Sequence, residues 1–263
     1  MTETATTLSD TSTWLPLDGL APGFDENKAP TVGDLHGREV VLDGPDGPVL
    51  SARFAGNRIE WDHGADDCET FLVDDDLYFT QFHPHARPEE AVSLFLDLRA
   101  GRALVVVTTI NDSGTPRVTQ RFVTATVRGA EVSGEEAAPT RALIGRRAMW
   151  VYSAEHAYEH VYLSPHWYSW QCLSGPEKGL ADTDENSVYQ LRPGIYVFTW
   201  REKVIPCASV TVADHRDVQR LRSHGVLFGL DETGRTPTHF TFGAHGRLLS
   251  NTVHPREYDP ALD

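Results

Sequence analysis

The chain has 263 residues with a hydrophobic content of 40%, 21 glycines and 16 prolines, and its formal net charge is −15. This acidity argues against nucleic acid or an anionic membrane as a partner, because both require basic surfaces. Cys68, Cys172 and Cys207 are too few and too far apart for a disulfide framework or a cysteine-rich zinc site. The first residues, MTETATTLSD, lack the apolar core of a signal peptide, and no window approaches the length of a membrane span. We therefore expect a soluble, cytoplasmic protein.

Residues 1–34 are predicted to form an N-terminal arm. Residues 1–12 are rich in threonine and serine, which favours mobility. Apolar anchors then follow between prolines and glycines: Trp14, Leu15, Leu17, Leu20 and Phe24. Tryptophan and phenylalanine are uncommon in disordered segments. We therefore expect this part of the arm to lie across a domain and to plug or cover it.

Residues 35–128 are predicted to form a first all-β barrel, because short apolar runs alternate there with turn signals. The strands are expected at 38–43, 49–54, 58–62, 68–73, 77–83, 91–98, 102–109 and 118–128. GPDG, AGN, DDD and RAG separate them at short intervals. Short antiparallel strands joined by such turns predict an up-and-down barrel or a sandwich. Residues 129–141 are small, acidic and proline-containing, and are predicted to be a linker.

Residues 142–255 repeat this pattern and predict a second barrel. LIGR at 143–146 matches LHGR at 35–38, and PGIYVFTWREKV at 193–204 matches DDLYFTQFHPHA at 75–86. The strands are expected at 146–153, 157–163, 167–172, 187–191, 194–202, 208–213, 223–228 and 239–251. Self-similarity of this kind predicts two tandem domains of one fold, followed by a tail at 256–263.

Glu202 is the candidate catalytic residue of the second barrel. The strand 194–202 alternates in a way that puts Tyr196, Trp200 and Glu202 on one face. A carboxyl group beside aromatic side chains is a candidate proton donor, because desolvation raises its pKa. Arg201 follows Trp200 and is a candidate for neutralising an anionic substrate. The alternative is a strand end whose arginine and glutamate simply meet water.

Aromatic residues elsewhere in the second half complete a candidate pocket. Trp150 and Tyr152 are two residues apart and therefore face one side of a strand. With Glu202 they would give a lumen with an apolar body and a few polar groups, which is typical of a small-molecule pocket. Ordinary core packing is the alternative for each aromatic. In the first barrel, His83 and Pro84 stand where Arg201 and Glu202 stand in the second, so we expect the first barrel to be supporting.

A polar, glycine-containing stretch at 169–186 is predicted to be a lid loop. It carries the bulky Trp170, and Lys178 is a candidate for binding an anionic substrate group. The alternative for Lys178 is an exposed lysine paired with Glu177. Asp182 and Asp184 begin like a calcium loop, but no glycine follows at position six and no glutamate at position twelve. We therefore expect no metal site.

Two resemblances follow from these motifs. SWQCLSGPEKGLADTD, WREKVIP and FGAHGRLLSNT resemble the C-terminal half of the molybdenum cofactor biosynthesis protein F (MoaF-like) family, and the two-copy layout is similar over nearly the whole chain. The resemblance implies calycin-like or lipocalin-like antiparallel barrels with a ligand cavity. It implies no molybdenum step.

The second copy also resembles the phenolic acid decarboxylases. Gly145 is followed by Trp150 and Tyr152 at the offsets of that family's first motif, and 194–202 fits its second motif. This resemblance implies that Tyr152 holds the substrate and that Glu202 donates the proton. Trp150 departs from the family's tyrosine, and Lys178 is the nearest cation where the family has an arginine.

Two functional hypotheses stand at this point. The first is a cofactor-independent lyase or isomerase that acts on a small aromatic or polyketide-like acid or enol in the second barrel. The second is a non-catalytic protein that binds or carries a small apolar ligand. Either would take a small molecule as partner, and association of the chain with itself is left open. An unpaired acid deep in the lumen would favour the enzyme, because a carrier has little need of one.

Overall fold

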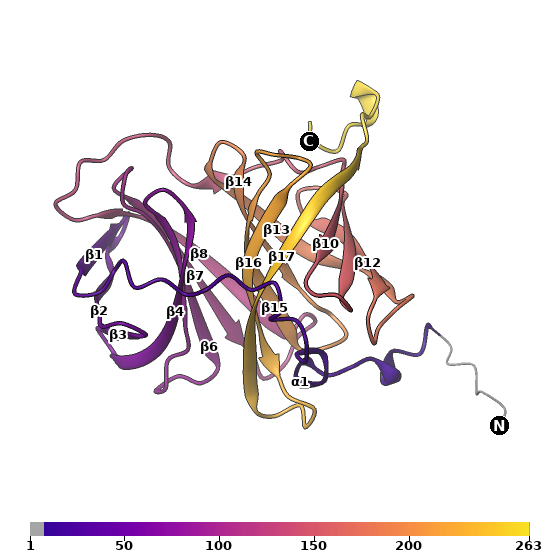
Figure 1. Ribbon diagram of the computed structural model, residues 1–263, viewed down its shortest axis with the longest axis horizontal. Coiled ribbons are helices and arrows are strands. Elements are labelled where there is room, and N and C mark those ends of the chain that lie inside the picture. Colours follow the sequence, from indigo (N-terminus) through magenta and orange to yellow (C-terminus); the bar gives the residue numbers. More distant parts are fainter. Residues whose placement is uncertain (1–7, 263) are drawn as a thin grey trace.

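The computed structural model describes residues 8–262; part of the stretch predicted to be mobile, residues 1–7, lies outside them. The described chain is almost entirely β-structure (Figure 1). Its helical elements are α1 (Leu17–Leu20) and the 3-10 turns η1 (Thr11–Thr13) and η2 (Arg256–Tyr258). Within residues 8–262 no helix combines the length and apolar character needed to cross a membrane.

The first barrel closes from eight strands in sequence order, with β1 paired to β8 through Leu42 and Val127. Alternating side chains such as Phe54, Ile59 and Leu94 fill its interior. The strands are β1 (Glu39–Gly44), β2 (Gly47–Phe54), β3 (Arg58–Trp61), β4 (Gly64–Asp74), β5 (Leu77–Phe82), β6 (Glu90–Asp97), β7 (Arg102–Ile110) and β8 (Val118–Val127). In the β4–β5 turn Asp76 takes a positive φ of 57°, a conformation that aspartate tolerates better than most residues.

The second barrel consists of β10 to β17 and closes where β12 pairs with β13. Its strands are β10 (Arg146–Val151), β11 (Ala157–Tyr162), β12 (Trp167–Ser174), β13 (Ala181–Arg192), β14 (Ile195–Arg201), β15 (Cys207–Asp214), β16 (Leu221–Leu230) and β17 (Pro237–Asn251). The predicted linker is open chain except for β9 (Ala138–Pro139), which adds to the edge of β13. Two tandem antiparallel barrels, the fold predicted from the sequence, are thus confirmed.

The two barrels share one strand order. β5 and β14, which begin at Leu77 and Ile195, are each the fifth strand of an eight-stranded antiparallel barrel. Each pairs next with a strand that ends in aspartate, Asp97 in β6 and Asp214 in β15. The sequence repeat therefore corresponds to a structural repeat.

The prediction of a lid loop over 169–186 is wrong. β12 extends to Ser174 and β13 begins at Ala181, so only a short turn at 175–180 separates two paired strands. Trp170 and Asp184 face inward and bond to each other, the indole N–H donating to the carboxylate over 2.8 Å. Polar inward residues made this hairpin resemble a loop in the sequence, whereas Trp170 across the ladder satisfies Asp184.

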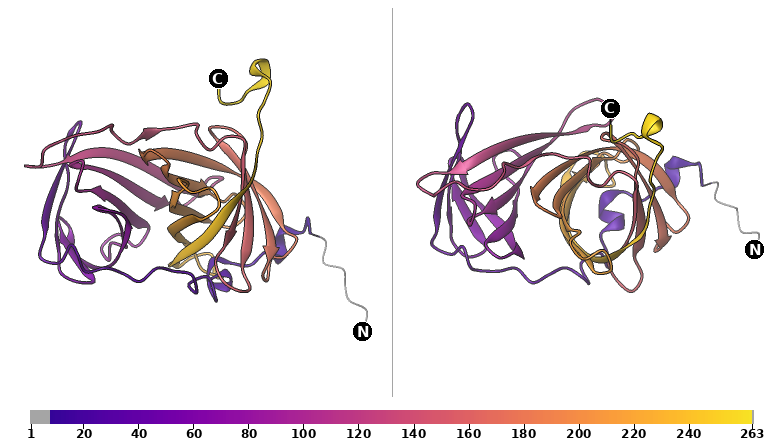
Figure 2. Two further views of the ribbon diagram at one scale, coloured as in Figure 1. Left: turned by 45° about the horizontal axis from the view of Figure 1, so that its top comes forward. Right: turned by 90° about the horizontal axis from the view of Figure 1, so that it is seen from above.

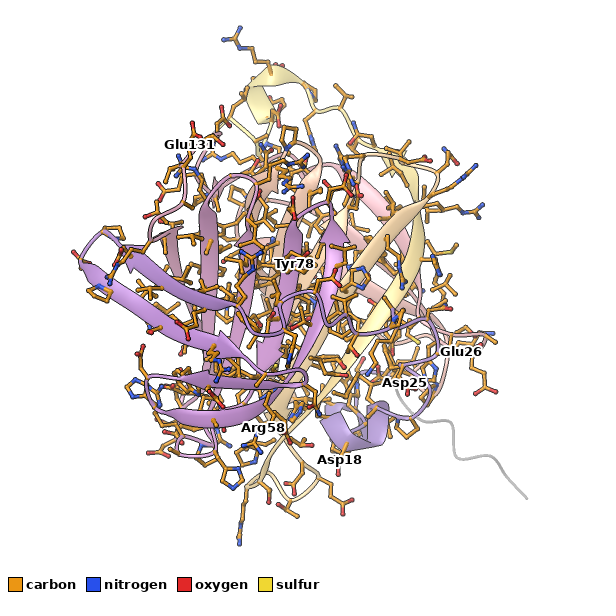
Figure 3. All side chains as sticks on the ribbon, turned by 60° about the vertical axis from the view of Figure 1, so that its left-hand side comes forward. Asp18, Asp25, Glu26, Arg58, Tyr78 and Glu131 are labelled. Carbon is orange, nitrogen blue, oxygen red and sulfur yellow. The ribbon has the colours of Figure 1, made fainter. Side chains whose placement is uncertain are left out.

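The N-terminal arm covers the second barrel, as expected for a plug. Leu17 of α1 and Phe24 are buried in the core of the second barrel, and α1 appears within the outline of that barrel when viewed from above (Figure 2). The Phe24 ring lies 4.8 Å from that of Tyr152. Polar residues of the same arm face outward, and Asp18, Asp25 and Glu26 lie exposed at the surface (Figure 3).

Beyond Phe24 the arm crosses from the second barrel to the first. The backbone N–H of Asn27 donates to the carbonyl of Tyr152 at 3.0 Å, and that of Val32 donates to Thr70 at 2.8 Å. Lys28 forms an ion pair with Glu69 of β4 at 2.9 Å. The arm thus holds both barrels as well as covering one of them.

The barrels pack against each other through apolar strand faces. Phe71, Phe79, Phe95, Leu104 and Val106 of the first barrel meet Ile195, Val197, Val210, Val212 and Val226 of the second. The rings of Phe122 and Tyr189 stack across the same boundary with centroids 4.5 Å apart. β14 and β15 are therefore buried on both faces, which explains why these strands are apolar nearly throughout.

One buried arginine links the barrels electrostatically. Arg192 at the end of β13 donates two hydrogen bonds to Asp97, at 2.7 and 2.8 Å, and one to Asp74 at 2.7 Å. Its side chain is only 12% exposed. Removing one partner of a buried ion pair leaves uncompensated charge, which is strongly destabilising.

Arg192→Met is expected to lower the free energy of unfolding by about 3 kcal/mol, because Asp97 loses its cationic partner and Asp74 is left with Arg216 and Arg99. Denaturant titration measures this. Arg53→Met is the matched control, since its pair with Glu60 spans 3.5 Å and both side chains are more than half exposed; it is expected to cost less than about 1 kcal/mol. Equal losses of unfolding free energy in the two variants would contradict a stabilising role for the ion pairs of Arg192.

Candidate functional site

A partly open cavity of about 70 Å³ lies at one end of the second barrel. Here β10, β12, β14 and β16 end, and the arm forms part of the wall through Trp14, Leu20 and Phe24. The rest of the lining is mainly aromatic. The volume accommodates a few water molecules and is well below the roughly 300 Å³ of a typical ligand pocket. The arm therefore narrows the site at this end of the barrel.

Glu202 lines this cavity and is 5% exposed. The alternation of β14 carries it there, because Phe198, Trp200 and Glu202 share the inward face. Its Oε1 accepts the backbone N–H groups of Lys203 and Val204, both at 3.0 Å, which fixes the carboxyl in position. Burial and then the negative charge of Asp184 raise the pKa of Glu202 to about 8. Glu202 is therefore mostly protonated at neutral pH.

Asp184 is the partner that keeps the proton on Glu202. Its side chain is fully buried and accepts the Trp170 indole N–H at 2.8 Å. The Lys203 ammonium lies 3.4 Å from Asp184 and 2.6 Å from Asp182. Burial raises the pKa of Asp184, while the bonds to Trp170, Lys203 and Glu202 favour its charged form. Asp184 thus accepts hydrogen bonds from Trp170 and Lys203, and it is the ionised member of the Asp184–Glu202 pair.

Asp182, Asp184 and Glu202 bring one oxygen each within 4.8 Å of one another, an arrangement that could hold a cation. Lys203 already supplies a positive charge to two of the three carboxyls. Glu202 is the protonated member of the Asp184–Glu202 pair, because burial and the charge of Asp184 raise its pKa to about 8. With Glu202 protonated, Lys203 offsets one of the two negative charges that Asp182 and Asp184 carry.

Glu177 is a second carboxyl in the cavity, and the sequence analysis did not single it out. It lies in the β12–β13 turn, is 6% exposed, and accepts the Tyr158 hydroxyl at 2.7 Å. Burial raises the pKa of Glu177, whereas the bond from Tyr158 lowers it. Burial also raises the pKa of Tyr158, which keeps the hydroxyl protonated as the donor. The neighbouring Lys178 is exposed and does not pair with Glu177.

His160 adds a neutral imidazole to the lining. Burial and the nearby His215 lower its pKa to about 3. Its Nδ1 is buried and has no hydrogen-bond partner among the described residues. The ring packs edge-on against Tyr168, with centroids 5.3 Å apart. His160 is thus available for a hydrogen bond to a ligand but remains uncharged across the physiological range.

Four of the eight predicted site residues meet in the cavity. Tyr152, Trp170, Trp200 and Glu202 all line it. They come from the β10–β11 turn, from β12 and from the end of β14, which barrel closure brings together.

The other four predicted residues lie outside the lining. Trp150 and Tyr196 are buried deeper in the barrel, each with its ring 5.7 Å from that of His215. Arg201 points to the opposite face of β14 and donates to Gln120 of the first barrel at 3.1 Å. Lys178 is exposed on the turn. Strand alternation explains why Arg201 points away from the cavity, because Trp200 and Glu202 on either side of it point inward.

Comparison with known proteins bears on both halves of the chain. The model of the MoaF N-terminal domain matches residues 12–112, and that of the MoaF C-terminal domain matches residues 137–252. Protein MoaF of Klebsiella aerogenes is 40% identical over 116 residues, which is 44% of this chain and 43% of the relative. The alignment thus spans less than half of that relative's length.

Among solved structures, a beta-lactamase candidate from Burkholderia vietnamiensis matches 42% of this chain and 98% of its own, with 12% identity and a TM-score of 0.33. A similarity of that size informs neither fold nor function. The family models together cover both barrels and much of the arm. This chain therefore belongs to the MoaF family.

Proposed function

We propose that the second barrel houses a cofactor-independent enzyme of lyase or isomerase type, with Glu202 as its proton donor. The observation that carries the proposal is a carboxyl group that lines an aromatic cavity, is nearly fully buried, and has its pKa raised to about 8. A general acid works best when its pKa lies near the working pH. Asp184 keeps Glu202 in that range by charge, and the aromatic walls suit a planar substrate.

The chemistry needs only this chain's own groups. Glu202 gives its proton to a carbon or oxygen of a conjugated acid or enol, and the charge left on Glu202 is then repelled by Asp184. This repulsion drives recovery of the proton from product or solvent. Tyr152 is placed to orient the substrate, because its ring lies in the wall between Phe24 and Phe242.

A carrier of small apolar ligands is the second candidate. Two observations favour it: the arm contributes apolar side chains to the cavity wall, and Glu202 accepts two backbone N–H groups of its own turn. An acid with that bonding could serve the turn alone. Against this, Glu202 is not paired with Arg201 and does not face solvent.

The test is turnover by Glu202→Gln on a panel of aromatic acrylic acids and enolisable ketones, in water and in D₂O. Loss of general acid catalysis is expected to reduce the rate by about 10²- to 10⁴-fold. Glu159→Gln is the matched control, because Glu159 is equally buried but pairs with Arg147 on the outward face of β11. Full activity in Glu202→Gln would exclude the proposal. Ligand binding without turnover in either protein would support the carrier.

A further inference from the structure

The cavity contains two carboxyl groups that are held by different partners. Glu202 carries a proton at neutral pH, because burial and then the negative charge of Asp184 raise its pKa to about 8. Glu177 accepts a hydrogen bond from Tyr158 and is therefore the acceptor of its pair. An acid and a base whose environments separate their pKa values are the usual components of proton-transfer sites.

These two carboxyl groups belong to one continuous site. The Tyr158 hydroxyl donates to Glu177, the Tyr158 ring lies 6.1 Å from that of Trp170, and the Trp170 indole donates to Asp184. The buried thiol of Cys207 also lines the cavity, and the charges of both Glu202 and Glu177 raise its pKa. Cys207 is thus within electrostatic range of both acids, which face one space.

We propose that Glu177 is the general base that complements Glu202, and that the site isomerises small, planar, enolisable carbonyl compounds by moving a proton between two carbons. This rests on the proposed function and narrows it from lyase or isomerase to isomerase. Tyr158 is the positioning residue that orients the Glu177 carboxylate. Decarboxylation would need the acid alone, so a built base is the feature that distinguishes the two reactions.

The proton inventory closes over one cycle. For a β,γ-unsaturated ketone, the Glu177 carboxylate takes a proton from the α-carbon, and the C–H electron pair becomes a new carbon–carbon double bond. The carbonyl oxygen then receives the proton of Glu202, which gives a dienol. In the second step Glu202 takes that proton back as the carbonyl re-forms, and Glu177 delivers its proton to the γ-carbon. The product is the conjugated ketone, and both residues return to their starting states.

Glu177 suits this role better than His160, the other group in the lining with a free acceptor. Burial lowers the pKa of His160 to about 3, so its imidazole is a poor base. Burial raises the pKa of Glu177 and so strengthens its basicity. The other titratable groups next to Glu177 are Tyr158, Cys172 and Cys207, whose pKa values are all raised, so they stay neutral.

The experiment follows cyclohex-3-enone as it becomes cyclohex-2-enone, by ultraviolet absorbance and by deuterium incorporation in D₂O, with the full chain. Glu177→Gln is expected to lower the isomerisation rate by about 10²- to 10⁴-fold. Glu159→Gln, which removes a buried carboxylate outside the cavity, is expected to leave the rate unchanged. Circular dichroism confirms that each variant folds.

The outcomes separate the two proposals. Loss in both Glu177→Gln and Glu202→Gln supports an acid–base pair. Loss in Glu202→Gln with full activity in Glu177→Gln overturns the role of Glu177 and leaves the proposed function intact. A wild-type rate no higher than that of the Glu177→Gln, Glu202→Gln double variant overturns isomerisation of enolisable ketones.

Tyr158→Phe provides a readout that a purely structural role would not move. The base must be deprotonated and the acid protonated, so Glu177 sets the acid limb of the rate profile and Glu202, with a pKa of about 8, sets the alkaline limb. The Tyr158 bond lowers the pKa of Glu177. Removing the hydroxyl is therefore expected to shift only the acid limb to higher pH. An unmoved acid limb would overturn the positioning role.

Discussion

Glu202→Gln should be more stable than the wild-type protein at pH 8, by about 4 kcal/mol. The physical reason is the raised pKa of Glu202, from 4.5 to about 8, in the folded state. Between these two values the folded protein holds a proton that the unfolded chain releases, so stability falls as pH rises through this window. Each pKa unit corresponds to roughly 1.4 kcal/mol. Glutamine is neutral, can still accept the two backbone N–H groups, and does not carry this cost.

The measurement is the free energy of unfolding from denaturant titration at several values between pH 4 and pH 9. The difference between variant and wild type should be near zero at the acid end and should grow with pH. Glu159→Gln is the control of opposite sign, because it removes an ion pair with Arg147 at 2.7 Å and should not stabilise. A Glu202→Gln variant with a lower free energy of unfolding than the wild type at pH 8 would instead show that ionised Glu202 stabilises the fold.

Phe24→Ala is expected to cost about 3 kcal/mol of folding free energy, because large-to-small changes in a core leave a cavity. Phe24 is 3% exposed, and its ring contacts those of Tyr152, His156 and Phe240. The same change enlarges the site cavity, of which Phe24 is a wall. A neutral aromatic dye, N-phenyl-1-naphthylamine, should therefore bind the variant more tightly than the wild type.

Val253→Ala is the control for this experiment, since Val253 is 86% exposed beyond the end of β17 and should change stability by less than about 0.5 kcal/mol. Unchanged stability together with unchanged dye binding in Phe24→Ala would show that the arm does not narrow the cavity in solution. The arm would then not restrict the entry of ligands into the cavity.

The alternation of inward and outward residues along each strand made much of the fold predictable from the sequence. Inward Phe198, Trp200 and Glu202 follow directly from the period of two in β14, and the internal repeat correctly paired Leu77 with Ile195. The prediction of a loop at 169–186 was wrong because the inward residues of this hairpin are polar. Asp184 reads as a loop residue until Trp170 lies opposite it, and that pairing depends on the register of β12 and β13.

The site was accessible only in part, for a similar reason. Glu202 could be predicted because its own strand places it. Asp184 reaches Glu202 only through the pairing of β13 with β14, and Glu177 turns inward only because a tight turn sets its direction. In the sequence Glu177 and Lys178 are adjacent charges with no periodic pattern around them. The turn decides that the glutamate is buried and the lysine exposed.

The apolar boundary between the barrels makes this chain comparable to a dimer whose subunits share one polypeptide. β14, the strand that leads to Glu202, presents Ile195 and Val197 to the first barrel rather than to water. A separate partner would leave this surface on dilution, whereas a tethered one experiences a constant effective concentration. The packing of the first barrel against β14, the strand that leads to Glu202, therefore does not depend on the concentration of the protein. Two barrels on one chain replace an association equilibrium with a covalent connection.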